Sequence, residues 1–135
     1  MSTEVKYTIR VQTFLVAFIL TFTACETETF IDYYVENRAS SIIYVYGKDL
    51  VHATMINDSL LPGKTMMIAG WRKWGKKTDS FDPKDMFGNT LVITNAVGDS
   101  CQKDHGLVSN WRTEIDEKRA VADHKYTLVI NNADF

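Results

Sequence analysis

The sequence lacks several features that would place it in a familiar structural class. Among its 135 residues are only two cysteines and two prolines, so a disulfide-rich scaffold is excluded and the domain must depend on a hydrophobic core. The formal net charge of −2 excludes a general electrostatic attraction to nucleic acid, and we expect no nucleic-acid partner. No apolar run reaches the roughly 20 residues that a membrane-spanning helix needs. Helical periodicity is also missing after residue 25.

The first 25 residues do have a distinctive composition, that of an export signal. Lys6 and Arg10 precede the apolar run 11–22, and small residues follow at 23–24. A basic start, a short apolar run and small residues before a cleavage site are typical of a secretory signal peptide. We therefore expect residues 1–24 to be a signal peptide whose apolar segment is helical.

The end of this segment, Phe22-Thr23-Ala24-Cys25, resembles the lipobox of bacterial lipoproteins. The resemblance implies that the peptide is cut before Cys25, that the thiol receives a diacylglyceryl group and that the new amine is acylated. Each buried methylene contributes about 0.8 kcal/mol, so two or three acyl chains hold a protein on a membrane stably. The resemblance thus implies that the protein belongs to the cell envelope. Its expected location is the outer membrane, with the domain on either the periplasmic face or the cell-surface face. The alternative is a secreted protein whose Cys25 carries no lipid.

The expected domain organisation follows from this cleavage. Residues 25–30 are polar and acidic and are expected to form a tether, and residues 31–135 are expected to form a single domain. Acidic residues directly after the lipidated cysteine resemble the surface-export signals of Bacteroidota lipoproteins, and a solvated linker explains them equally well. With Cys25 lipidated, Cys101 is the only remaining thiol and has no disulfide partner in the chain.

Alternation of apolar and polar residues with a period of two dominates the mature chain. Ile31, Tyr33 and Val35 share one face of a predicted strand. The segment 41–46 is β-branched and aromatic throughout, which predicts a strand covered on both faces. The segment 70–78 is basic and contains two glycines, and we expect it to form the far side of a hairpin. The expected strands are residues 31–36, 41–46, 50–57, 65–69, 89–94, 111–115 and 125–130.

The segment 82–87 interrupts this pattern. Asp82 suits a helix N-cap, Pro83 the first helical position and Asp85 the first turn, so one helical turn is expected near 83–87. About six to eight short strands, with turn signals roughly every eight to twelve residues, predict an all-β fold, an antiparallel immunoglobulin-like β-sandwich. In length and pattern the chain resembles the small immunoglobulin-like lipoproteins of unknown function in Bacteroidota.

The most unusual stretch of the mature chain is residues 71–77, where two tryptophans lie among four cations. Indole rings stack on sugar rings and cations pair with acidic groups, so the candidate ligand-binding residues are Trp71, Arg72, Trp74 and Lys76. Interleaved aromatic and basic residues also bind single-stranded nucleic acid, a partner that export makes inaccessible. The alternative is a structural hairpin with one tryptophan in the core and lysines that keep a sheet edge soluble.

Aspartates form the second group of candidates. Asp79, Asp82 and Asp85 offer oxygen ligands of the kind that Ca²⁺ prefers. Their spacing is not that of an EF-hand loop, and helix capping already explains Asp82, so no metal site is expected. Asp99 and Asp104 lie in a loop with two glycines, where aspartates commonly serve turns.

Cys101 and His105 form the third group, because a cysteine and a histidine can act as nucleophile and base. Such chemistry also needs an orienting group and an oxyanion hole, and neither is evident in the sequence. Zinc needs three or four ligands, and the other histidines, His52 and His124, are distant in sequence. We therefore expect a protein that is not an enzyme.

These features together favour a non-catalytic binding or structural module that needs no cofactor. Its expected partner is a glycan or another envelope protein, met through a surface around Trp71 and Trp74. An enzyme that depends on Cys101, and an accessory subunit that offers a strand edge to a partner, are the alternatives. The tripeptide Asp58-Ser59-Leu60 resembles the O-glycosylation acceptor of exported Bacteroidota proteins, and a polar turn is the simpler interpretation.

Overall fold

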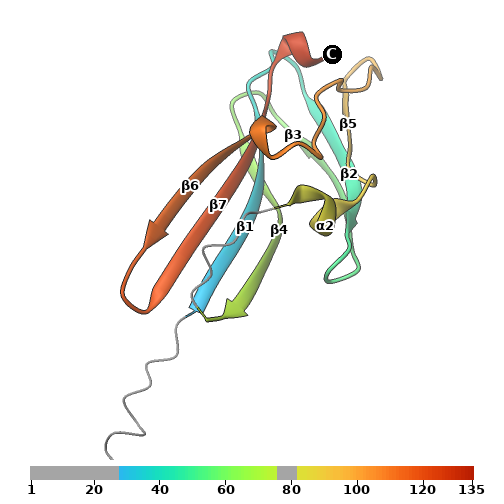
Figure 1. Ribbon diagram of the computed structural model, residues 1–135. Coiled ribbons are helices and arrows are strands. Elements are labelled where there is room, and N and C mark those ends of the chain that lie inside the picture. Colours follow the sequence, from blue (N-terminus) through green and yellow to red (C-terminus); the bar gives the residue numbers. More distant parts are fainter. Residues whose placement is uncertain (1–27, 76–81) are drawn as a thin grey trace, which may run out of the picture.

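A computed structural model describes residues 28–75 and 82–135, so the expected signal peptide, Cys25, Lys76 and Asp79 lie outside the described residues. In these residues seven strands form two sheets, which confirms the predicted two-layer all-β fold (Figure 1). Sheet A has the strand order β4-β1-β7-β6, with β1 (Glu28–Asn37), β4 (Thr65–Trp74), β6 (Trp111–Glu117) and β7 (Val121–Ile130). Sheet B has the order β3-β2-β5, with β2 (Ile43–Asp49), β3 (Thr54–Leu60) and β5 (Val92–Asn95).

Short helical segments complete the described part of the chain: α2 (Pro83–Phe87) and the 3-10 turns η1 (Val108–Asn110) and η2 (Asn132–Asp134). The helical turn predicted near 83–87 is confirmed. Asp82 Oδ1 accepts a hydrogen bond from Lys84 N at 2.9 Å, and Pro83 is the first helical residue, so the expected N-cap is present. None of the helices in residues 28–75 and 82–135 has the length and apolar character to cross a membrane.

Strand pairing departs from the antiparallel expectation at one place. β1 runs parallel to β7, in a register from Glu28 opposite Val121 to Asn37 opposite Ile130, whereas the other four pairs are antiparallel. The reason is topological: the chain leaves β1 for sheet B and returns to sheet A before β7, so no tight hairpin imposes opposite directions on the two strands. β1 consequently lies inside sheet A, between β4 and β7.

Several strand bounds differ from those expected from the sequence: the strand expected at 50–57, for example, is β3 at Thr54–Leu60, and two further differences bear on the candidate site. β1 begins at Glu28, inside the expected tether 25–30. Residues 70–74 continue β4 and do not turn back as the far side of a hairpin. Gly70 lies opposite Asp32 in the β1–β4 pair, and a Cβ atom there would stand 2.8 Å from Asp32 Oδ1. Crowding by neighbouring side chains, and not a change of direction, therefore explains this glycine.

A bulge in β4 changes which of its side chains face the core. Tyr33 of β1 pairs with Ala69, whereas the next residue, Tyr34, pairs with Met67. Ile68 is thus an extra residue on β4, and Ile68 and Ala69 are both buried although they are consecutive. After the bulge, every second residue from Ala69 onward faces the core side of sheet A.

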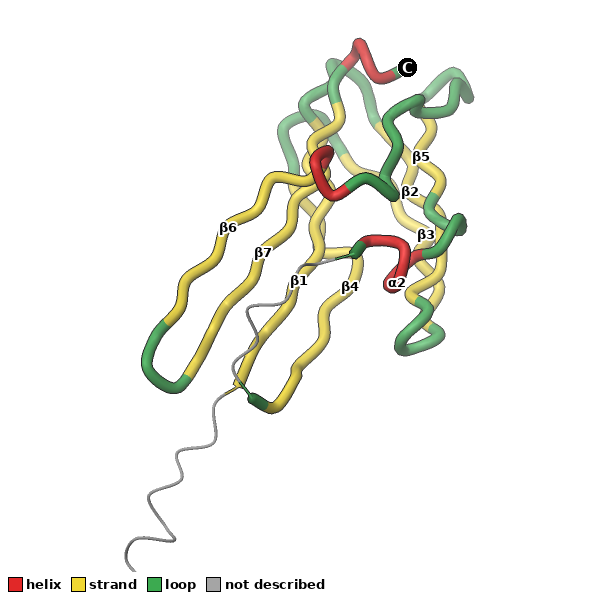
Figure 2. Tube along the Cα trace, viewed as in Figure 1, coloured by secondary structure: helices red, strands yellow, loops and turns green. Residues whose placement is uncertain are grey.

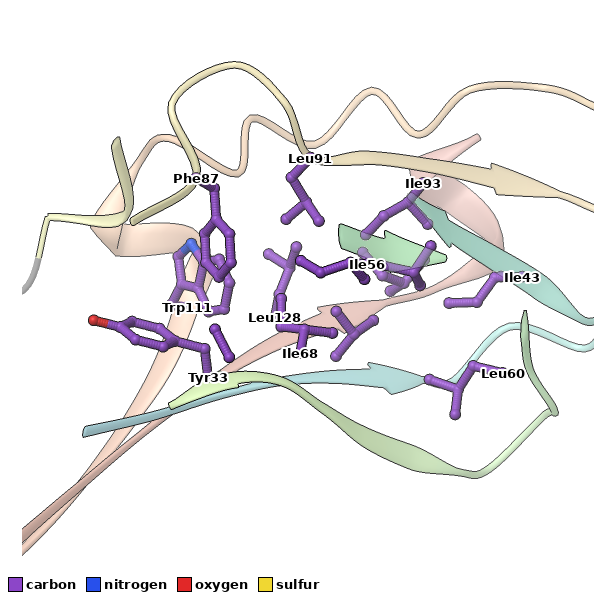
Figure 3. Close-up of a cluster of buried hydrophobic side chains, with 14 of the residues drawn as sticks. Tyr33, Ile43, Ile56, Leu60, Ile68, Phe87, Leu91, Ile93, Trp111 and Leu128 are labelled. Atoms are coloured by element: carbon purple, nitrogen blue, oxygen red, sulfur yellow. The ribbon is translucent and has the colours of Figure 1, made fainter. Parts of the chain in front are cut away.

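The core lies between the two sheets and is closed by α2 (Figure 3). The Phe87 ring stacks on the Trp111 ring, with centroids 6.0 Å apart and planes inclined by 3°. The same ring meets the edge of Tyr33 at 5.5 Å. Such aromatic pairs add to the stabilisation that comes from buried area alone. The aliphatic part of the core includes Val35, Ile43, Val45, Leu91, Ile93, Leu128 and Ile130.

Sheet A extends past sheet B at one end (Figures 1 and 2). This end holds the start of β1, the end of β4 and the hairpin between β6 and β7. We call it the tether end and define it by Glu28, residues 71–75 and residues 117–121. Glu28 comes three positions after Cys25 in the chain, so the expected lipid-bearing residue precedes this end of the sheet.

Candidate functional site

The two tryptophans of the predicted ligand-binding segment lie on opposite faces of sheet A. They are three residues apart in β4, and an odd separation in a strand places side chains on opposite faces. Trp71 packs partly buried against the core, where its Nε1 atom is buried without a hydrogen-bond partner and Lys73 Nζ lies 5.5 Å from a ring centroid. Trp74 is 64% exposed on the outer face. The pair therefore cannot form one stacking platform.

Arg72 shares the outer face with Trp74 but is held by its own sheet. The guanidinium Cζ lies 4.8 Å from the Phe30 ring centroid, and Nη1 lies 3.7 Å from Glu28 Oε1. Both contacts hold the Arg72 side chain against β1. Lys76 lies outside the described residues. Of the four predicted ligand-binding residues, Trp74 is the one that the structure shows with a ring open to solvent.

The described candidate aspartates lie in a short helix and in loops, where most of them make local hydrogen bonds. Asp82 caps α2, and Asp85 lies in the first turn of the same helix. Asp99 Oδ2 accepts a hydrogen bond from Asn95 Nδ2 at 2.9 Å, and Asp104 Oδ1 accepts one from the backbone of Gly106 at 2.8 Å. Asp79 lies outside the described residues. Within residues 28–75 and 82–135 no group of three or more histidine, cysteine or acidic side chains is placed to hold a metal ion.

Cys101 and His105 both line a pocket of about 230 Å³ beside β5. The pocket is bounded by Leu91, Val92, Ile93, Ser100, Cys101, Lys103, His105 and Leu128. Sites for drug-sized ligands usually enclose about 300–1,000 Å³, so this pocket is small for such a ligand. The sequence thus correctly places these two residues in one loop, and the structure shows that residues of this loop line the pocket together with apolar residues near β5 and in β7.

The electrostatics of this pocket do not favour thiol chemistry. Burial raises the pKa of the Cys101 thiol, and burial lowers the pKa of the His105 ring. Both shifts favour the neutral forms, whereas a cysteine nucleophile acts as the thiolate. The cation in the pocket is engaged elsewhere, because Lys103 Nζ donates to Val129 O at 2.6 Å and lies 3.0 Å from Asp134 Oδ2.

The remaining singled-out residues do not line this pocket. His52 lies in the turn between β2 and β3, with Nδ1 2.6 Å from Asp49 Oδ2. His124 is buried in β7, with Nδ1 3.4 Å from Tyr126 Oη. Ser59, of the tripeptide that resembles a glycosylation acceptor, is exposed in the edge strand β3. The interpretation of that tripeptide as a polar turn is therefore wrong, because its residues continue the ladder with β2.

A pair of tyrosines that the sequence analysis did not select stands on the outer face of sheet B. Tyr44 and Tyr46 alternate with the buried Val45 in β2, so their rings share one face. Tyr46 is 42% exposed, so the prediction that residues 41–46 are covered on both faces is wrong. Because β2 is the middle strand of sheet B, the rings have neighbours on both sides. We define the tyrosine face as Tyr44 and Tyr46 with their cross-strand neighbours Asn57, Ser59, Val92 and Thr94.

Exposed aromatic rings thus occur at two separate places in the described residues. One is the tyrosine face of sheet B, and the other is Trp74 at the tether end of sheet A, which extends away from sheet B (Figure 1). A scan against protein-family models found none that matches the chain, and searches of curated proteins and of solved structures found no match either.

Proposed function

We propose that the protein is a lipoprotein of the bacterial cell envelope, held on the outer membrane by a lipid at Cys25, whose domain is a non-catalytic module that binds a glycan. The motif Phe22-Thr23-Ala24-Cys25 supports the anchor. The start of β1 at Glu28 is in keeping with it, because the first strand begins three positions after the residue proposed to carry the lipid. The glycan-binding surface that we assign is the tyrosine face.

The observation that carries this assignment is the position of the two tyrosines on one outward face of β2. Aromatic rings on the outer face of a sheet offer stacking surfaces for sugar rings at little cost in conformational entropy. The neighbours Asn57, Ser59 and Thr94 supply amide and hydroxyl groups, which donate to and accept from sugar hydroxyls. None of these three side chains is charged. The chemistry therefore suits a neutral, hydroxyl-rich glycan.

The tyrosine face is better suited to bind a glycan than Trp71 and Trp74, the binding residues predicted from the sequence. Trp71 and Trp74 face opposite sides of sheet A, so one sugar chain cannot stack on both. The neutral forms favoured at Cys101 and His105 support a binding role over thiol catalysis. A partner protein on the tyrosine face is the competing interpretation, and the binding experiment separates it from a glycan.

Replacement of Tyr46 by alanine is expected to weaken glycan binding about tenfold, since an anchor residue of an interface commonly contributes more than about 1 kcal/mol. The measurement is isothermal titration of the full chain with a panel of envelope glycans. Tyr46 is 42% exposed, so the substitution removes a ring from the surface without opening the core.

The matched control is Trp74→Ala, which removes an exposed ring from the other sheet and leaves glycan affinity unchanged. Equal glycan affinity for Tyr46→Ala and the unmodified chain contradicts the assignment of the tyrosine face. If no glycan of the panel binds, and an envelope protein binds only when Tyr46 is present, the partner of the tyrosine face is a protein and the glycan assignment is wrong.

Replacement of Cys25 by serine is expected to abolish membrane association, because serine offers no thiol for the lipid. Mass spectrometry of the chain made in bacterial cells should give a mature amino terminus at residue 25 with the mass of its acyl groups. The matched control is Cys101→Ser, which removes the other cysteine and leaves acylation intact. An unacylated chain that still begins at Met1 and remains in the soluble cytosol contradicts the anchor.

A further inference from the structure

The tether end carries an exposed indole directly beside the start of the domain. Trp74 is the last residue of β4 and lies opposite Glu28, the first residue of β1. Thr29 Oγ1 donates a hydrogen bond to Gly75 O at 2.8 Å, so the end of β4 is fixed to the start of β1. The Trp74 side chain is nevertheless 64% exposed. A large aromatic ring is thus held out from a rigid sheet at a defined position.

The chain that precedes the domain brings the proposed lipid close to this ring. Three residue steps separate Cys25 from Glu28, and an extended chain covers at most about 3.6 Å per residue, so the two residues are within about 11 Å. Glu28 and Trp74 lie opposite each other on neighbouring strands, which are about 4.8 Å apart, so this spacing is added to the distance from Cys25. The polar interface on each side of a bilayer is roughly 5–8 Å thick. Trp74 therefore lies within about 16 Å of the residue proposed to carry the lipid, a reach that allows the tether end to contact the headgroups.

We infer that Trp74 inserts into the headgroup interface of the bilayer that carries the Cys25 lipid and so orients the domain on the membrane. This inference rests on the proposed lipid anchor. Tryptophan is enriched at membrane interfaces, because its ring is largely apolar while its N–H still reaches a polar partner. The tether end is then the membrane-facing end, and the tyrosine face on sheet B is carried away from the bilayer.

Charge is not what distinguishes this contact. Two of the four cations of the tether end have carboxylates beside them: Arg72 Nη1 lies 3.7 Å from Glu28 Oε1, and Lys118 Nζ lies 2.9 Å from Asp116 Oδ2. Lys73 and Arg119 give this end an excess of cations, which would add attraction to an anionic bilayer. A contact made through the indole does not need that attraction, so it should also form on a zwitterionic bilayer.

Quenching of tryptophan fluorescence by brominated lipids tests the inference. The acylated full chain is reconstituted into phosphatidylcholine vesicles, with and without acyl chains brominated close to the headgroup. The chain has three tryptophans, of which Trp111 is buried in the core and Trp71 packs against it. We expect brominated lipid to lower the emission of the unmodified chain and of Trp71→Phe, and to have almost no effect on Trp74→Phe.

A matched control moves the indole to the opposite end of the same strand. Leu61 is 55% exposed in the turn before β4, and the ten residues of β4 span roughly 30 Å. The double variant Leu61→Trp, Trp74→Phe therefore carries an equally exposed indole far from the tether end. We expect brominated lipid to leave its emission unchanged. Circular dichroism confirms that each variant keeps its strands.

The outcomes separate the inference from the anchor on which it rests. Acylated, vesicle-bound protein whose Trp74 is not quenched overturns the inference and leaves the anchor standing. Equal quenching of the Leu61→Trp, Trp74→Phe variant also overturns it, because the domain would then have no preferred end at the membrane. A chain whose mass shows no lipid on Cys25 overturns the anchor, and the inference with it.

Discussion

Replacement of Phe87 by alanine should lower the free energy of unfolding by about 3–5 kcal/mol, the usual loss when a fully buried phenylalanine is truncated. Phe87 has 0% exposure, although it comes from a helix of only five residues. Its ring stacks on Trp111 and meets the edge of Tyr33, so truncation opens a cavity between sheet A and α2. Equilibrium unfolding in urea, followed by far-ultraviolet circular dichroism, measures this loss.

Two further variants show whether the lost ring is the cause. Phe87→Leu keeps an apolar side chain of similar volume and should lose less stability than Phe87→Ala. Val97→Ala shortens a side chain that is 86% exposed and should stay within about 0.5 kcal/mol of the unmodified chain. A loss for Phe87→Ala as small as that of Val97→Ala would contradict the described core.

Replacement of Asn37 by leucine should cost about 3–5 kcal/mol, because each buried polar group left unpaired costs about 1–3 kcal/mol. Asn37 has 0% exposure at the end of β1, and its side chain joins three backbone groups. Its Nδ2 atom donates to Ser41 O at 2.9 Å and to Leu60 O at 2.8 Å. Its Oδ1 atom accepts from Ala39 N at 2.9 Å. Leucine fills the space but satisfies none of these groups.

Urea unfolding of Asn37→Leu measures the loss. Asn57→Leu is the matched control, because it makes the same replacement at an exposed position of β3 and should change stability by about 0.5 kcal/mol or less. Comparable losses for the two variants would show that the hydrogen bonds of Asn37 contribute little. A loss confined to Asn37→Leu supports its role in joining the end of β1 to the loop before β2 and to the end of β3.

The variant Asn37→Asp should make the same site sensitive to pH. An ionised carboxylate places negative charge where two carbonyl oxygens now accept, whereas the protonated acid can donate to one of them. Burial and these carbonyls raise the folded-state pKa above the value of about 3.9 in the unfolded chain. The variant is therefore most stable below that unfolded value and loses stability as pH rises toward the folded value. Unfolding at pH 4 and pH 7 tests this, and equal losses at both contradict it.

Local chemistry explains which parts of the fold the sequence predicts. The alternation of apolar and polar residues predicts β1 and β7, because one face of each strand is buried. Asp82 as N-cap and Pro83 as first helical residue predict α2, because helix capping depends only on residues adjacent in the sequence. The parallel pairing of β1 with β7 depends on residues far apart in the chain, such as Glu28 and Val121, and no local pattern encodes it. The bulge at Ile68 is equally hidden, because it is defined only against its partner strand.

The candidate site is predictable only in part, for a related reason. If Gly70 is interpreted as the start of a hairpin, the sequence does not predict that β4 continues to residue 74. Trp71 and Trp74 are then assigned to one surface. In a strand their spacing of three separates them. Tyr44 and Tyr46 have the spacing of two that places rings together, but the β-branched and aromatic residues of segment 41–46 do not indicate which face remains open. The exposure of Tyr46 depends on which parts of the chain cover the outer face of sheet B, and the local sequence does not predict that.

The position of β1 also determines when the domain can assemble during synthesis. β1 is made first among the strands, yet one of its two neighbours is β7, the last. A growing polypeptide therefore cannot complete sheet A until its final strand has left the ribosome, and contacts of such large sequence separation form slowly. Deletion of residues 121–135 would remove β7 and with it one of the two partners of β1.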